Sequence, residues 1–355
     1  REARWCVRTD EGTEYRAPVV ISAVGGLSRP ALPEIEGMGR FAGPSFHSAE
    51  WDHSVALTGK RVAVIGTGAS AIQIVPEIAG TVAQLHLFQR TPPWVIPRPD
   101  RRVSGIEQRS FRRFPVLQRL WRWLLYWRLE SRGTAFVVFP RLGALVEALA
   151  RWNIRRGIKD PALRTEVTPD FPAGCKRVLL SDDYYPALAR HNVHVVTRAI
   201  REITPSGIVT SDGIETPVDV IVWCTGFRAT DPVPAGLFVG RDGLDLTERW
   251  QDGLEAYLGM SVSGFPNLFI LNGPNTGLGH NSVVFMLESQ MRYVMDAIIR
   301  MRRDGIRSLE VRRDVERAFN ARLQERLADT VWASGCRSWY LDANGKNTTL
   351  WPGYT

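Results

Sequence analysis

The stretch that decides the fold is Lys60-Arg61-Val62-Ala63-Val64-Ile65-Gly66-Thr67-Gly68-Ala69-Ser70-Ala71. Its first half is a short apolar run, which is typical of a strand buried on both faces. Its second half puts two glycines before a segment with helical spacing, and a second strand is expected at Gln84–Phe88. Gly66 suits a tight turn, Gly68 lets backbone approach a pyrophosphate, and Ala71 allows close packing of the helix on the strand. The stretch therefore predicts a β-α-β unit with a dinucleotide site at the helix N-terminus, and the alternative is a plain tight turn.

The end of the second strand indicates which dinucleotide binds. In NAD sites, an acid about 20 residues after the glycines holds the 2′-hydroxyl of the ribose. Here the sequence is Phe88-Gln89-Arg90-Thr91, which has no acid but offers an arginine and a hydroxyl. A guanidinium attracts a 2′-phosphate, so the sequence favours NADP. The alternative is that Arg90 is a solvated surface charge.

Composition limits the class of protein. The 355 residues are 44% apolar and 23% charged, which excludes a disordered chain and indicates two or three domains. The net charge of +8 fits a nucleic acid, a membrane surface or a polyanionic cofactor, and charge alone does not choose among them. The four cysteines include no Cys-x-x-Cys pair, so neither a disulfide framework nor a metal site is expected. Because no apolar run has the length of a spanning helix and no signal peptide is visible, the expected location is cytoplasmic.

Two parts of the chain share one pattern, in which a polar turn precedes an apolar strand and a glycine ends it. The first copy is 9–25, whose run Val19-Val20-Ile21 is expected to be buried on both faces, and the second copy is 211–226. Two copies indicate two dinucleotide-binding lobes, unless the pattern recurs by chance. The first copy has no Gly-x-Gly-x-x-Gly before it, because the chain starts at Arg1 within a strand-like run. We therefore expect that turn upstream of Arg1 and expect the native N-terminus to be missing.

Residues 109–132 have an unusual composition for a helix. Apolar side chains recur there at helical spacing, at Phe111, Phe114, Leu117, Trp121, Leu124 and Leu125. The same stretch holds seven arginines against one acid, Glu130. Aromatic residues with arginines fit a helix on a membrane surface, or a nucleic-acid face, although no recognition motif accompanies them. The favoured interpretation is a helical insert whose apolar face packs on the cofactor domain. Membrane-surface contact stays an alternative that is not favoured, and nucleic acid is not expected.

A further pattern, Phe41-x-Gly43-x-x-x-His47-x-x-x-Trp51-Asp52, lies directly before the β-α-β unit. Taken alone, a histidine near an aromatic ring is more often a packed, hydrogen-bonded residue than a catalyst. The full spacing, however, resembles the fingerprint of Baeyer–Villiger monooxygenases. These are class B flavin-dependent enzymes that use FAD, NADPH and O2.

The resemblance extends over essentially the whole chain. It includes Phe88-Gln89-Arg90-Thr91-Pro92, Cys175-Lys176-Arg177, Cys224-Thr225-Gly226-Phe227, Asn272-Gly273-Pro274-Asn275 and Ser338-Trp339-Tyr340. By position, it implies that the turn for the NADP pyrophosphate is formed by Gly66, Thr67, Gly68, Ala69, Ser70, Ala71 and Gln73. It further implies that the 2′-phosphate is recognised by Arg90, Thr91 and Lys176, and that the nicotinamide cofactor is covered by Trp339. Without the resemblance, core packing is the default role of Trp339.

Two residues are implied to act in catalysis. Arg177 matches the arginine beside the flavin, where a fixed guanidinium stabilises the negative charge that develops during the reaction. Without the resemblance, Arg177 is better interpreted as a surface charge. His47 matches the histidine of the fingerprint, which we interpret as a conformational coupler between domains and not as a base.

The resemblance implies an α/β fold with two Rossmann-like lobes, one for FAD and one for NADP, and a helical insert. The expected parts are the end of an N-terminal FAD lobe (1–44), the NADP lobe in two segments (45–97 and 170–227), the insert (98–169) and the rest of the FAD lobe (228–355). The implied reaction inserts one oxygen atom of O2 beside a ketone carbonyl and gives an ester or a lactone. The alternatives are a flavin-dependent N- or S-oxygenase, and an NADP-binding fragment without activity.

Overall fold

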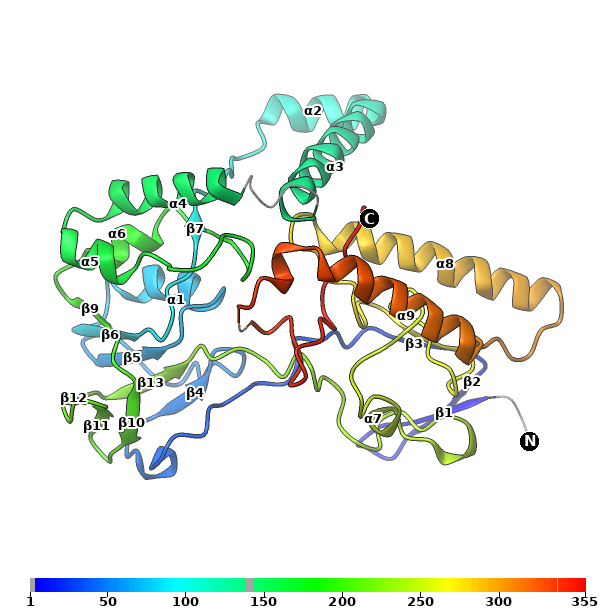
Figure 1. Cartoon of the computed structure of the whole chain (residues 1–355), viewed down its shortest axis with the longest axis horizontal. Helices are drawn as coiled ribbons and strands as arrows, with labels where there is room; N and C mark the ends of the chain where they lie inside the picture. The colour runs from blue at the N-terminus through cyan, green and yellow to red at the C-terminus, as the bar shows by residue number, and fades with distance from the viewer. Residues whose placement is uncertain (1–3, 138–142, 337) are drawn as a thin grey trace. The chain divides into compact units, whose positions relative to one another are not determined.

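The computed structural model describes residues 4–137, 143–336 and 338–355 (Figure 1). The contacts within the chain divide it into two units. Unit 1 consists of Arg1–Arg29, Val103–Arg141 and Arg228–Thr355, and unit 2 consists of Pro30–Arg102 and Leu142–Phe227. Among the described residues, no helix combines the length and the apolar character that crossing a bilayer requires.

Unit 2 is built on a five-stranded sheet in which all neighbouring strands are parallel. Its strand order is β4 (Ser45–His47), β13 (Val220–Trp223), β5 (Arg61–Ile65), β6 (Gln84–Phe88) and β9 (Val193–Val196). Helix α1 (Ala71–Ile78) connects β5 to β6, so the predicted β-α-β unit is confirmed.

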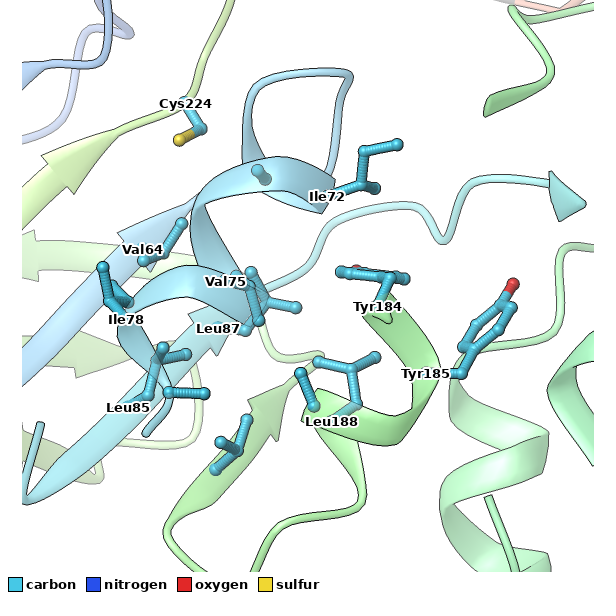
Figure 2. Close-up of a cluster of buried hydrophobic side chains, with 14 of the residues drawn as sticks. Val64, Ile72, Val75, Ile78, Leu85, Leu87, Tyr184, Tyr185, Leu188 and Cys224 are labelled. Carbon is cyan, nitrogen blue, oxygen red and sulfur yellow. The ribbon is translucent and has the colours of Figure 1, made fainter. Parts of the chain in front are cut away.

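Both faces of this sheet are covered, which explains the continuous apolar run of β5. Val62 and Val64 pack in one cluster, whereas Ala63 and Ile65 pack in another. The first cluster contains the buried face of α1 and the buried side of α6 (Tyr184–Leu188), as Figure 2 shows for Val75 and Leu188. The second cluster adds residues of an antiparallel sheet formed by β10 (Ile200–Ile203), β11 (Gly207–Thr210) and β12 (Glu215–Pro217).

Most of the remaining elements of unit 2 flank the predicted phosphate-binding residues Arg90, Thr91 and Lys176 in the sequence. The parallel strands β7 (Val95–Ile96) and β8 (Leu179–Leu180) pair with each other. Helix α4 (Gly143–Gly157) is joined to both segments by the side chain of Asn153, whose amide donates to the carbonyls of Val95 and Ser181. A short helix α5 (Pro161–Glu166) follows α4, and a 3-10 turn η1 (Met38–Arg40) precedes β4.

Unit 1 contains the first copy of the repeated pattern. A hairpin of β1 (Trp5–Arg8) and β2 (Glu14–Ala17) leads into β3 (Val20–Ser22), which pairs in parallel with β14 (Leu268–Ile270). The expectation that Val19–Ile21 is buried on both faces is wrong, because the Ile21 side chain is 39% exposed. The physical reason is that, among the described residues, β3 has β14 as its only strand neighbour.

Helices make up most of the rest of unit 1. Helix α8 (Val283–Arg303) contributes Val294 and Ala297 to a buried cluster that also contains Phe269 of β14. Helix α9 (Arg313–Ala328) follows it. Shorter helical elements are η3 (Arg241–Gly243), α7 (Leu246–Arg249) and η4 (Val331–Ala333).

The two units have different bounds from the five parts expected from the sequence. Residues 30–44 belong to unit 2, where the amide of Ile203 donates to the carbonyl of Glu36 and Ala31 donates to Gly226. The expected insert is divided, because Val103–Arg141 belongs to unit 1 and α4 belongs to unit 2. The assignment of either unit to a cofactor remains a prediction.

The arginine-rich stretch forms two helices, α2 (Gly105–Arg113) and α3 (Pro115–Val137), with a break at Phe114. The expected packing of its apolar face is wrong. Of the six apolar residues named for that face, four are exposed, at Phe114, Leu117, Trp121 and Leu124. The side of α3 that packs on unit 1 instead carries Arg122, Tyr126 and Glu130, whose contacts lie far along the chain.

Candidate functional site

The predicted glycine turn lies at the carboxyl end of β5, directly before α1. Gly66 has a backbone φ of +108°, which residues with a side chain rarely adopt. A Cβ placed on it would lie 2.4 Å from the carbonyl oxygen of Cys224. A Cβ on Gly68 would meet no atom within 4 Å, so this glycine faces open space. Ala71 is fully buried at the start of α1. The turn thus has the tight bend, the open backbone and the close helix packing that a pyrophosphate site needs.

The adjacent strand brings the predicted phosphate-binding residues to this turn. The amide of Gly66 donates to the carbonyl of Phe88, the last residue of β6, at 3.0 Å. Two residues further on, Arg90 is exposed, and the hydroxyl of Thr67 donates to the carbonyl of Thr91 at 2.8 Å. Because carboxyl ends of parallel strands meet at one edge, the glycine turn and the pair Arg90–Thr91 form one site.

A second cation belongs to the same region of unit 2. Lys176 is half-buried, and its ammonium lies 4.7 Å from the centre of the Phe171 ring. The pKa of Lys176 is lowered by burial and by the positive charge of Arg90, against the opposing charge of Asp170. The two positive charges repel each other, and a bound phosphate would relieve this repulsion.

Arg177 follows Lys176 and is exposed, just before β8. The preceding Gly174 has a φ of +97°, and Cys175 is buried, so the backbone before the two cations is held in place. Within the described part of unit 2, the Arg177 side chain is too exposed to be a packed core residue. Its position permits a contact with a bound molecule, and its role in catalysis remains a prediction.

His47 ends β4 and is only 2% exposed. Its Nδ1 accepts the amide hydrogen of Ala49 at 3.1 Å, and its ring contacts the edge of Phe227 with 5.4 Å between centres. The Nε2 atom is buried and has no partner among the described residues. Since Nδ1 is an acceptor, Nε2 carries the proton, and a buried donor without a partner is costly. His47 is therefore a packed residue with one donor available to a bound group.

Trp339 lies in unit 1, next to Tyr340, with 4.7 Å between the ring centres. Tyr340 is buried, whereas Trp339 is 40% exposed. Ordinary core packing, which is the default role of a tryptophan, therefore does not describe Trp339. Its position in unit 1 does not test the prediction that Trp339 covers a bound cofactor.

Sequence reasoning missed the residues that support this site from a distance. Phe171 and Phe227 were not singled out as partners of Lys176 and His47, although Phe227 belongs to one quoted motif and Phe171 lies four residues before another. Gln89 is 3% exposed and its amide donates to the carbonyl of Glu166, which fixes the chain before Arg90. The contacts of His47 and Gln89 join segments far apart in sequence, whereas Phe171 lies only five residues before Lys176. The usable signal was the presence of Phe227 and Gln89 within quoted motifs.

The reactivity of two of the four cysteines follows from their surroundings. Cys6 is exposed and Cys224 is buried, and both are free thiols. Burial raises the pKa of Cys224 to about 12, so its thiol is neutral at physiological pH. Cys224 therefore contributes its backbone carbonyl to the glycine turn and is not a nucleophile. Among the described residues, no group of histidine, cysteine or acidic side chains has the arrangement of a metal site.

Comparisons with known proteins first give the class. The sequence model of the flavin-binding monooxygenase-like family matches residues 3–127. In crystal structures, the chain is similar to the OTEMO complex with FAD and NADP, with a TM-score of 0.84, 28% identity, and coverage of 99% of this chain and 74% of that one. It is also similar to a cyclohexanone monooxygenase from Rhodococcus sp. Phi1 bound to NADP+, with a TM-score of 0.85, 28% identity, and coverage of 99% and 73%.

Sequence relatives then give the family. The chain is 53% identical to a Baeyer-Villiger monooxygenase of Pseudomonas aeruginosa, over 100% of this chain and 68% of the relative. It is 49% identical to a Baeyer-Villiger monooxygenase of Streptomyces coelicolor, with the same coverage of 100% and 68%. The chain belongs to the Baeyer–Villiger monooxygenase family. The α/β fold and the family predicted from the sequence are thus confirmed.

Proposed function

We propose that this chain is the NADP-binding and catalytic part of a monooxygenase that uses FAD, NADPH and O2 to convert a ketone into an ester or a lactone. The observation that supports it most is the joined site at the ends of β5 and β6, where an open glycine turn meets Arg90 and Lys176. The named relatives and the crystal structures with FAD and NADP support the same reaction class. We also propose a cytoplasmic location, where NADPH is supplied.

The residues of unit 2 fit NADP. The open space at Gly68 leaves room for the pyrophosphate, and the N-terminus of α1 favours its negative charge. Arg90, Thr91 and Lys176 would hold the 2′-phosphate, because two cations and a hydroxyl suit three acceptor oxygens. Gln73 lies on the first turn of α1 with its amide bonded to the carbonyl of Ala69, and it would brace the turn around the phosphates.

The residues of unit 1 fit FAD less completely. When bound, FAD supplies the activation of O2, which no protein side chain provides. The spacing Gly-x-Gly-x-x-Ala occurs at Gly66–Ala71, directly before α1, and at Gly37–Ala42, around the 3-10 turn η1, and both lie in unit 2. Neither occurrence lies in unit 1, so we name no residue of unit 1 for the flavin pyrophosphate.

Arg177 is the residue proposed to act on the reacting atoms. The adduct of a ketone with an oxygen nucleophile carries negative charge, which an exposed and permanently charged guanidinium can stabilise as it develops. Trp339 is proposed to cover the nicotinamide, since its exposed ring is available to stack. His47 is proposed to couple cofactor binding to the conformation of β4 through its buried Nε2 donor.

A competition assay with the intact gene product, loaded with FAD, tests the reaction class. Equal concentrations of a cyclic ketone, an aryl sulfide and a tertiary amine are offered with NADPH, and the products are separated and weighed. Ester or lactone as the main product supports the proposal. Sulfoxide or N-oxide without ester would move the function to a heteroatom oxygenase. A preparation that binds NADPH but consumes none in the presence of FAD would move it to a cofactor-binding module.

A further inference from the structure

Helices α2 and α3, cyan in Figure 1, carry the largest group of exposed apolar side chains among the described residues. We define the apolar face of α3 as five side chains that are each between 41% and 52% exposed: Leu117, Leu120, Trp121, Leu124 and Trp127. Phe114, Val116 and Trp123 are exposed as well, at 56%, 66% and 56%, although at about 100° per residue Val116 and Trp123 lie nearer the Tyr126 side of the helix. Exposed apolar surface of this extent marks a contact with a partner.

The apolar face lies on the side of α3 that points away from the rest of unit 1. At about 100° per residue, Leu117 and Leu124 lie about 180° and 160° around the helix from Tyr126. The Tyr126 ring contacts Phe285 of α8 with 5.1 Å between centres, so Tyr126 marks the packed side. Leu120 and Trp127 fall within about 80° of the direction opposite Tyr126, which completes a stripe along the helix.

Polar contacts on the packed side hold α3 in place. Arg122 donates to Glu288 at 2.5 Å and lies 4.6 Å from the centre of the Phe285 ring. One turn later than Tyr126, the buried carboxylate of Glu130 bonds to the His280 ring at 3.2 Å and to the Asn281 amide at 2.8 Å. Burial raises the pKa of Glu130, but hydrogen bonds from Thr355, Asn281 and His280 outweigh it and lower the pKa, so the carboxylate stays charged and bonded. Because these contacts fix α3 to the rest of unit 1, its apolar face has a defined position on the surface of that unit.

Charge identifies what the face binds. Residues 109–132 contain seven arginines, and their one acid is Glu130, which points inward to His280. Among the described residues, Arg112, Arg113 and Arg128 form no ion pair, so their charge is available to an anion. Leucine and tryptophan on one stripe, with arginines along it, are the composition of a helix that lies in the headgroup region of a bilayer.

We propose that α2 and α3 bind the surface of a membrane that contains anionic lipids. The helix would lie in the plane of the bilayer, with its apolar face among the acyl chains and its guanidinium groups on the lipid phosphates. The helix of 23 residues would span about 35 Å along the surface. This inference does not rest on the proposed reaction, because it uses no residue of the NADP site.

The charges argue against the other occupants of such a face. A second copy joined by a two-fold axis would place the arginines of one helix against those of the other, and like charges repel. A nucleic acid would engage the arginines but would leave the leucine and tryptophan stripe in water, since nucleic-acid interfaces are polar. Only an anionic bilayer satisfies both parts of the surface.

The test is sedimentation of the intact gene product with vesicles of phosphatidylcholine alone and with 30% phosphatidylglycerol, read by protein in the pellet and by tryptophan emission. We expect binding to the anionic vesicles, a blue shift of the emission, and loss of binding at 0.5 M salt. The pair Leu120→Ala and Leu124→Ala should weaken binding about tenfold, and Arg112→Gln with Arg113→Gln about twentyfold.

The control is Ile299→Ala on α8, which removes an apolar side chain that is 57% exposed outside the proposed face and should leave binding unchanged. Far-ultraviolet circular dichroism of each variant confirms that the fold is retained. Equal binding to both vesicle types, or α3 variants that bind like the control, would overturn the proposal. A dimer in sedimentation equilibrium that the leucine pair dissociates, or tighter binding to a single-stranded RNA probe than to vesicles, would assign the face to those partners instead.

Discussion

Replacing Arg90 with alanine removes one of the two cations at the end of β6 without touching the sheet, because the Arg90 side chain is exposed. A hydrogen bond between a charged donor and a phosphate contributes about 1.5–3 kcal/mol. The exposure of Arg90 puts it near the lower end, so we expect NADP+ to bind about tenfold more weakly. NAD+ has no 2′-phosphate, and its affinity should change less than about twofold.

The assay is calorimetric titration of Arg90→Ala with both dinucleotides, beside the matched variant Arg98→Ala. Arg98 is an exposed arginine on the same connection, paired with Asp100 at 3.0 Å, and its loss should change neither affinity. The pKa of Lys176 should rise in Arg90→Ala, since the positive charge that lowers it is gone. If NAD+ and NADP+ lose affinity equally, Arg90 does not read the 2′-phosphate and the assignment of the site is refuted.

Four further predictions concern the turn, the sheet and the reacting arginine. Gly66→Ala should lower the unfolding free energy by about 2 kcal/mol or more, because its Cβ would lie 2.4 Å from a backbone carbonyl, as thermal unfolding would show. Gly68→Ala should keep the fold and lose NADP+ affinity in the same titration, because its Cβ enters only the open space of the turn. The pKa of His86 is lowered from 6.5 to about 4, mainly by burial and also by His194 beside it. The unfolded chain therefore binds a proton first, and the unfolding free energy should fall as the pH drops from about 6.5 to about 4. Arg177→Ala should abolish oxygenation but keep the reduction of FAD by NADPH, measured by loss of flavin absorbance.

Each of these has an outcome that would contradict it. Gly66→Ala that melts like the wild type would show that the turn relaxes without cost, and a Gly68→Ala variant with unchanged affinity would place the pyrophosphate elsewhere. For His86, denaturant titrations from pH 4 to 7 are compared with His86→Gln, whose profile should be flatter. A variant of Arg177 that loses flavin reduction as well would show that Arg177 acts in cofactor binding.

The β-α-β unit was predictable because its signals are local. The strand β5 is buried on both faces and therefore reads as a continuous apolar run, and the glycine at a positive φ marks its end. The end of β6 was equally clear, since an arginine stands where an acid would hold a 2′-hydroxyl.

Helix α3 was not predictable in the same way. Apolar residues at helical spacing normally mark the buried face, but here the packed side carries Arg122, Tyr126 and Glu130. Their partners stand about 150 residues or more away along the chain, so no local pattern announces them. The contact of His47 with Phe227 was hidden for the same reason. Phe171 lies only five residues before Lys176, but their contact depends on a ring position that sequence spacing does not fix.

The mass of the product formed under labelled O2 tests the central claim most directly. The intact gene product would be incubated with FAD, NADPH, 18O2 and a panel of linear, cyclic and aryl ketones, one ketone at a time. The account predicts an ester or a lactone that carries one labelled oxygen and is two mass units heavier than the product formed under unlabelled O2. Consumption of NADPH that yields hydrogen peroxide and leaves every ketone unchanged would contradict it.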